Sequence, residues 1–137
     1  MLISKYLSYI SRVRQKDILD RLEKYKIGNT DYPIILFLSR NSGYGQNEVA
    51  RELKISKSLI TKSVVNLERK GYIIKSTSEK NKSKNLLKLT LEGEELVPNI
   101  KKIIKDYENK ILKDLSKEDV EKLNELLEKI YLNSIEK

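Results

Sequence analysis

QNEVARELKISKSLITKSVVNLERKG, residues 46–71, predicts two short helices joined by a tight turn. Apolar residues recur at helical spacing in both halves: Val49, Ala50 and Leu53 in the first, and Ile60, Val64 and Leu67 in the second. Each helix therefore has one face to bury. Ser56 is a suitable N-cap for the second helix, Ile55 can fill the gap at the turn, and Gly71 can close the unit. Such a helical hairpin is typical of a helix-turn-helix.

The outward face of the second helix is polar and basic. This basic strip consists of Lys57, Ser58, Thr61, Lys62 and Val65, with Arg69 one turn later. A helix with such a face suits the major groove of DNA, where short hydroxyls meet base edges and cations meet phosphates. An ordinary amphipathic hairpin with a solvated face would show the same pattern.

Charge is distributed unevenly over the 137 residues. Residues 1–30 contain 7 basic residues (Lys and Arg) and 3 acidic ones (Asp and Glu). Residues 31–91 contain 12 basic and 5 acidic residues, and residues 92–137 contain 9 basic and 12 acidic residues. The net values are +4, +7 and −3, so the segment that contains the hairpin is the basic one. A basic segment indicates a polyanionic partner, although it can also serve solubility alone.

Helices are predicted on the N-terminal side of the hairpin. Residues 2–25 carry apolar residues at spacings of three and four, and Gly28 with Asn29 is expected to end this helix. Thr30 is placed to cap a second helix, Asp31–Arg40, whose apolar run predicts a central buried element; a short buried strand is the alternative.

A β-hairpin is predicted directly after Gly71. Tyr72, Ile73 and Ile74 begin a β-branched run, residues 75–85 form a polar lysine-rich loop, and residues 86–89 return as a second strand. Two helices followed by such a hairpin give the order of a winged helix-turn-helix. The loop would then be a wing whose lysines reach phosphates or the minor groove. These lysines are Lys80, Lys82 and Lys84. A solvated loop tip is the alternative.

Two long helices are predicted at the C-terminal end. Thr90 can cap one over about residues 91–115, and Ser116 can cap the last, in which Val120, Leu123, Leu127 and Ile130 form one apolar seam. The first helix and these two carry more apolar surface than the small winged lobe can cover. The fold class is therefore mainly α (α+β), and we expect a homodimer built from both chain ends.

Four segments resemble the MarR family of bacterial and archaeal transcription regulators. They are Glu48–Leu53, Ser56–Lys62, Leu67–Ile73 and Leu89–Gly93, which are similar to the family's E-L-A, S-x-x-T-R, L-E-x-x-G-L-I and L-T-x-x-G signatures. Each signature alone is weak, but four in register are specific. The resemblance covers nearly the whole chain as a single domain, with a winged lobe at 30–91 and dimerisation helices at 1–27 and 92–137.

The resemblance implies a DNA-binding homodimer, a repressor that holds pseudo-palindromic promoter sites through two winged lobes. It also implies a small, often anionic aromatic effector that releases the DNA. Two departures weaken the DNA contact: Asn81-Lys82-Ser83 replaces the family's Asp-Arg-Arg in the wing, and Lys62 replaces an arginine. A lysine lacks the planar fork of arginine, so minor-groove selectivity should be weaker.

The DNA-binding residues expected are Ser56, Lys57, Ser58, Thr61 and Lys62 in the major groove, Arg69 and Lys75 on the backbone, and Lys80, Lys82 and Lys84 in the wing. The effector pocket is expected to involve Tyr6, Tyr9, Arg12, Tyr32 and Tyr107, although aromatic residues at helical spacing are more often core than pocket.

Other function classes receive less support. Without Cys or His, thiol chemistry is excluded, metal sensing is disfavoured, no cofactor is expected, and an enzyme would have to rely on carboxylates or lysines. No apolar run approaches a membrane span, and the N-terminus does not resemble a secretory signal, so a cytoplasmic protein is expected. A winged-helix module that binds protein or RNA is the alternative function.

Overall fold

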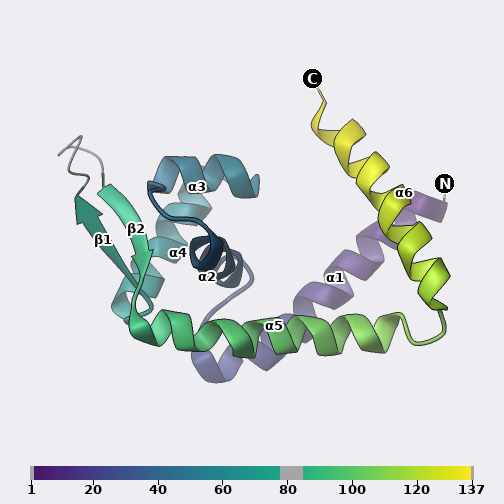
Figure 1. Cartoon of the computed structure of the whole chain (residues 1–137), viewed down its shortest axis with the longest axis horizontal. Coiled ribbons are helices and arrows are strands. Elements are labelled where there is room, and N and C mark those ends of the chain that lie inside the picture. Colours follow the sequence, from purple (N-terminus) through teal and green to yellow (C-terminus); the bar gives the residue numbers. More distant parts are fainter. Residues whose placement is uncertain (1, 78–84, 137) are drawn as a thin grey trace. The chain divides into compact units, whose positions relative to one another are not determined.

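The computed structural model describes residues 2–77 and 85–136. Seven helical elements and two strands follow in order: α1 Leu2–Leu22, the 3-10 helix η1 Glu23–Tyr25, α2 Asp31–Arg40, α3 Gln46–Leu53, α4 Lys57–Arg69, β1 Ile73–Thr77, β2 Asn85–Leu89, α5 Leu91–Ile111 and α6 Lys117–Ile135 (Figure 1). The fold is mainly α with a small antiparallel sheet, as the sequence predicts. None of the helices in the described part is both long and apolar enough to cross a membrane.

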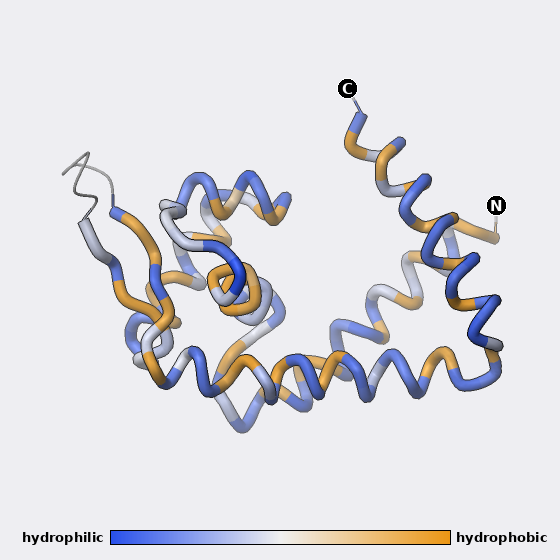
Figure 2. Tube along the Cα trace, viewed as in Figure 1, coloured by the Kyte–Doolittle hydropathy of each residue, from blue (hydrophilic) through white to orange (hydrophobic). Residues whose placement is uncertain are grey.

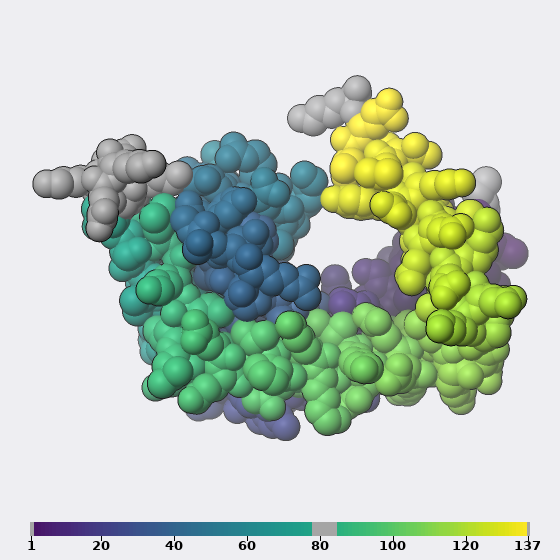
Figure 3. Space-filling model, in the orientation of Figure 1, coloured from purple at the N-terminus to yellow at the C-terminus, as the bar shows by residue number. Residues whose placement is uncertain are grey.

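The chain divides into two compact units, Met1–Ile104 and Lys105–Lys137. The core of the first unit lies among α2, α3, α4, the sheet and the first half of α5, and it takes in Ile18 and Leu22 from the end of α1. α2 supplies Ile34 and Ile35, which are fully buried, as expected for a central helix. Figure 2 shows the apolar run along α2, and Figure 3 shows the α2–α3 segment packed against the strands on the visible face.

The α4–β1 junction follows from one glycine. Gly71 has φ +82, a conformation that L side chains rarely adopt, and its N–H donates to Glu68 O at 3.0 Å. The next N–H, of Tyr72, donates to Leu67 O at 2.9 Å, which completes a Schellman-type helix end. The chain therefore leaves α4 and enters β1 within three residues.

The two-stranded wing sheet has an additional isolated β-bridge that the sequence does not reveal. β1 and β2 pair in the register Ile73↔Leu89 to Thr77↔Asn85. On the other edge of β2, Gly45 forms an isolated bridge with Leu86, and Leu87 N–H donates to Tyr44 O at 2.9 Å. The loop before α3 is thereby hydrogen-bonded to the wing.

Thr90 connects the wing to α5. Its hydroxyl donates to Gly71 O at 2.6 Å and accepts the Gly93 N–H at 3.1 Å, which confirms its predicted cap role. In the second unit, Ser116 Oγ accepts Asp119 N–H at 3.1 Å, and Asp119 Oδ2 accepts Ser116 N–H at 3.2 Å, a capping box that starts α6.

Three local predictions are wrong. The first helical segment covers residues 2–25 as predicted, but Lys26, with φ 58, closes it in place of the Gly28-Asn29 pair. Thr30 makes no side-chain cap bond, because Pro33 has no N–H and the N–H groups of Asp31 and Tyr32 donate to Gly28 O at 3.1 and 3.3 Å. α5 ends at Ile111 rather than at residue 115, and residues 112–114 form a turn before the Ser116 cap.

Candidate nucleic-acid interface

The start of α4 is fixed by the α3–α4 turn. Lys54 has φ 58 at the end of α3, and Ile55 N–H donates to Ala50 O at 3.1 Å while its side chain packs against the core. Ser56 then caps α4, since its Oγ accepts the Leu59 N–H at 3.3 Å. With Ile60, Val64 and Leu67 fully buried, the rotation of α4 about its axis is fixed.

The basic strip of α4 is exposed along its length, as predicted from the helical spacing. Lys57, Ser58, Thr61, Lys62, Val65 and Arg69 all have exposed side chains. A shallow hollow of about 720 Å³ follows this face. Its lining consists of Ser58, Leu59, Thr61, Lys62, Val65, Asn66 and Arg69. Leu59 is exposed here as well, which the apolar pattern alone did not indicate.

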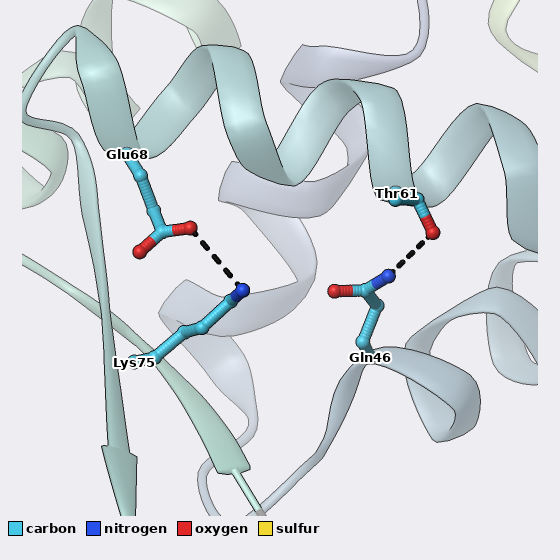
Figure 4. Close-up of polar contacts among 4 residues, drawn as sticks. All are labelled: Gln46, Thr61, Glu68 and Lys75. Carbon is cyan, nitrogen blue, oxygen red and sulfur yellow. Dashed lines mark hydrogen bonds and ion pairs between the residues drawn. The ribbon is translucent and has the colours of Figure 1, made fainter.

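One edge of the strip is tied to α3. Gln46 Nε2 donates to Thr61 Oγ1 at 2.6 Å (Figure 4). The Thr61 hydroxyl in turn donates to Lys57 O at 2.8 Å. Gln46 is the first residue of α3. The Thr61 hydroxyl is thus engaged twice within the protein, which leaves it one acceptor position toward a ligand.

The C-terminal half of α4 is tied to α2. Asn66 Nδ2 donates to Asp31 Oδ2 at 2.9 Å, and Asn66 Oδ1 accepts from Arg69 Nη2 at 3.2 Å. Because Asp31 is buried in the first turn of α2, the chain of bonds holds Arg69 over the α4 surface. Its guanidinium keeps further N–H donors for an anion.

Lys75 on β1 has an acidic partner. Its Nζ lies 3.4 Å from Glu68 Oε1, and both side chains are about one third exposed (Figure 4). The ion pair neutralises Glu68, the carboxylate on this part of α4, and it reduces the net positive charge that Lys75 offers to a phosphate. The predicted wing residues Lys80, Lys82 and Lys84 lie outside the described residues.

The sequence and the fold agree with known proteins. The sequence model described as the MarR family matches residues 25–82. HTH-type transcriptional regulator BilQ of Clostridioides difficile (strain CD3) is 31% identical over 121 residues, which cover 85% of this chain and 82% of that protein. The chain belongs to the MarR family of transcriptional regulators.

Solved structures of MarR proteins share the architecture. A MarR transcriptional regulator from Methanosarcina mazei Go1 has a TM-score of 0.90 and 27% identity, over 98% of this chain and 96% of that one. The transcriptional repressor CouR, solved bound to a 23-mer DNA duplex, has a TM-score of 0.80 and 22% identity, over 93% and 91%. The likeness to CouR is one of fold.

The residues expected around an effector in this MarR chain have different environments. Tyr6 and Tyr9 are exposed on α1, and the guanidinium of Arg12 lies 5.5 Å from the Tyr9 ring centroid. Tyr32 is buried, and its hydroxyl accepts from Arg14 Nη1 at 2.9 Å. Tyr107 is buried and belongs to the second unit. The effector pocket stays a prediction.

Sequence reasoning missed three residues at the candidate interface of this MarR protein: Leu59 and Asn66 on α4, and Gln46 at the start of α3. Leu59 and Asn66 could have been found, because a helical projection places Leu59 three residues before Lys62 and Asn66 four residues after it. Gln46 could not, since it is 15 positions from Thr61 in the chain and meets it only through the packing of α3 on α4.

Proposed function

We propose that the protein binds double-stranded promoter DNA sequence-specifically, as a homodimer, and acts as a repressor. The observation that carries this proposal is the exposed basic strip of α4, which is held outward by a fully buried opposite face. In a major groove, Lys57 and Lys62 would meet phosphates and base edges, and Ser56, Ser58 and Thr61 would approach the bases. Arg69 and Lys75 would contact the sugar–phosphate backbone.

The exposed apolar residues at the two chain ends support the homodimer. On α1 they are Leu2, Ile3, Tyr6, Leu7, Tyr9, Ile10 and Val13, and on α6 they are Leu126, Leu127, Ile130, Tyr131, Leu132 and Ile135. Apolar surface of this extent on each of the two helices favours burial against another chain. A two-fold dimer would present two α4 helices to half-sites about one helical turn apart, ~34 to 36 Å. CouR, which has a similar fold, was solved bound to a DNA duplex, and this supports DNA binding by the present fold.

The test is a fluorescence-anisotropy titration with the DNA upstream of the protein's own gene, over a series of salt concentrations. We expect affinity to fall by about 10³-fold or more between ~50 and ~200 mM salt if six or more phosphates are contacted. A Thr61→Ala, Lys62→Ala double variant should lose specific binding. A Ser39→Ala, Lys129→Ala variant removes one hydroxyl and one cation outside α4, and it should bind like the parent.

Two results would contradict the proposal: no binding at low salt, or parental affinity in the Thr61, Lys62 double variant. Binding that is indifferent to duplex sequence would favour the alternative, a winged-helix module for RNA or protein. The predicted effector adds one arm to the experiment, in which a panel of phenolic acids is titrated into the protein–DNA complex. Release of the DNA by one of them would identify the effector class.

A further inference from the structure

The hydrogen-bonding groups on the basic strip are largely committed within the protein. Thr61 Oγ1 accepts from Gln46 and donates to Lys57 O. Ser56 Oγ accepts the Leu59 N–H, and Ser58 Oγ lies 3.3 Å from it. The uncommitted hydrogen-bonding capacity of the strip therefore consists mainly of the ammonium groups of Lys57 and Lys62 and the remaining N–H donors of Arg69. The lysine ammonium groups are strongly hydrated point charges, which are poorly suited to telling one base pair from another.

Apolar groups occupy the middle of the same surface. The Val65 side chain is 54% exposed, and the Leu59 side chain is 48% exposed. Val65 lies seven residues after Ser58, almost two full turns, so both share the centre line of the outward face. Both apolar side chains line the hollow that Lys62 and Arg69 also line. Val65 is exposed to solvent between two cations, and among the described residues it does not belong to the hydrophobic core.

The charge around Val65 identifies what would cover it. Lys62 and Arg69 flank it on the helix face, and the acid on this part of α4, Glu68, is paired with Lys75. A polyanion complements this frame, whereas an apolar protein surface would have to desolvate both cations. In the major groove, thymine alone among the four bases presents a methyl group, at C5, and that group contacts apolar side chains.

We propose that Val65 is a specificity-determining residue, which reads the C5 methyl group of a thymine in each half-site. The proposal rests on the DNA-binding function proposed above. Leu59 forms an apolar wall of the same hollow.

The experiment compares thymine with deoxyuridine, which differs only by the missing methyl group. The preferred duplex is first selected from a random pool with the intact protein. Each thymine is then replaced singly by deoxyuridine, and binding is measured by fluorescence anisotropy for the parent and for Val65→Ala. We expect the parent to lose about fourfold in affinity at one thymine per half-site, the factor that corresponds to burial of one methyl group.

At that thymine, Val65→Ala should show a clearly smaller difference between the two duplexes than the parent, because the shorter alanine side chain loses most of the contact. Leu91→Ala removes another exposed apolar side chain, outside α4, and should retain the parental fourfold difference. The proposal is overturned if parent and Val65→Ala show the same ratio at every thymine, or if no preferred sequence emerges. In the first case, salt-sensitive binding to the preferred duplex would leave the proposed DNA-binding function standing. The absence of a preferred sequence, or of any duplex binding, would remove both.

Discussion

Asn66 Nδ2 donates to Asp31 Oδ2 at 2.9 Å, and this bond joins the middle of α4 to the first turn of α2. The same oxygen accepts the Gly28 N–H at 2.8 Å. Asp31 is 7% exposed and both hydrogen bonds are partly buried, so removal of the carboxylate would leave two partly buried donors without this acceptor. One buried carboxylate therefore fixes both the chain entry into α2 and the side of α4 that carries Arg69.

Replacing Asp31 by Ala should lower the free energy of unfolding by about 1–3 kcal/mol, because two donors lose their acceptor. The loss of an acid from the first turn of α2 adds to the effect. Urea denaturation followed by circular dichroism measures it. Glu52→Ala, an exposed acid on α3, should stay within about 0.5 kcal/mol of the parent. An unchanged urea midpoint in Asp31→Ala would show that the network has no share in stability.

Gly93 in the first turn of α5 allows the close approach of β1. A Cβ at this position would collide with the Tyr72 carbonyl oxygen, which also accepts the Thr90 N–H at 3.0 Å. Glycine to alanine inside a helix normally stabilises, but here the backbone must move, so Gly93→Ala should destabilise by about 1–3 kcal/mol. Gly28→Ala is the matched control, because its Cβ would find its nearest atom at 3.8 Å. A higher melting temperature for Gly93→Ala than for the parent would contradict the prediction.

The part of the fold that the sequence predicts is the part with local causes. The rotation of α4 follows from Ile60, Val64 and Leu67 at helical spacing, and its start follows from the Ser56 cap, four residues earlier than Ile60. The helix end at Gly71 depends on hydrogen bonds within five residues. Such features are determined by residues close together in the sequence, and the exposed basic strip follows from them.

The remaining features depend on contacts between distant segments. The Gly45↔Leu86 bridge spans 41 positions, and no local pattern in a glycine-rich loop indicates a strand. Lys26, rather than the nearby Gly28, adopts the left-handed conformation at the end of η1. Gly28 instead donates its N–H to the buried Asp31, which also accepts from Asn66, 35 positions away, and propensity alone does not contain this tertiary constraint.

Gln46 and Thr61 should be energetically coupled. Removing either partner of the 2.6 Å hydrogen bond makes removal of the second less costly. A double-mutant cycle of Gln46→Ala and Thr61→Val, measured by urea denaturation, should give a coupling energy of about 0.5–1 kcal/mol, because both side chains lie near the surface. Gln46→Ala paired with Ser58→Ala is the control cycle, and there the two effects should add. A coupling energy of zero for Gln46 and Thr61 would mean that the bond does not persist in solution.

Ionisation of the Tyr72 phenol should lower the free energy of unfolding at alkaline pH. Burial raises the pKa of Tyr72 above its ordinary value, and the negative charge of Glu92 and the nearby Tyr25 add to the rise. As the pH passes about 10, the unfolded chain loses this proton before the folded chain does, so the stabilisation present below that pH is lost above it.

Tyr72→Phe should therefore show a smaller fall in the free energy of unfolding above pH ~10 than the parent. At about pH 7 the two proteins should differ only by the hydrogen bond from the Tyr72 hydroxyl to Tyr25 O, at 3.2 Å. Urea denaturation at both pH values, for parent and variant, isolates the tyrosine from the lysines that titrate in the same range. Identical slopes above pH ~10 would contradict the raised pKa.

Ile10 tests the dimer proposed from the chain ends. It is 52% exposed on α1 and lies seven residues, about two helical turns, after Ile3. Leu7 and Val13 flank it on the same apolar face. In a dimer that buries this face, Ile10→Glu would place an unpaired carboxylate against apolar groups, so the dimer dissociation constant should rise by at least about 100-fold. Sedimentation velocity over a concentration series measures the change, and DNA affinity should fall with it, since a monomer holds one half-site instead of two. Ile74→Glu introduces the same charge at a 50% exposed position on β1 and should remain dimeric. If Ile10→Glu sediments like the parent at every concentration, α1 does not form the interface, and the exposed residues of α6 would have to carry it alone.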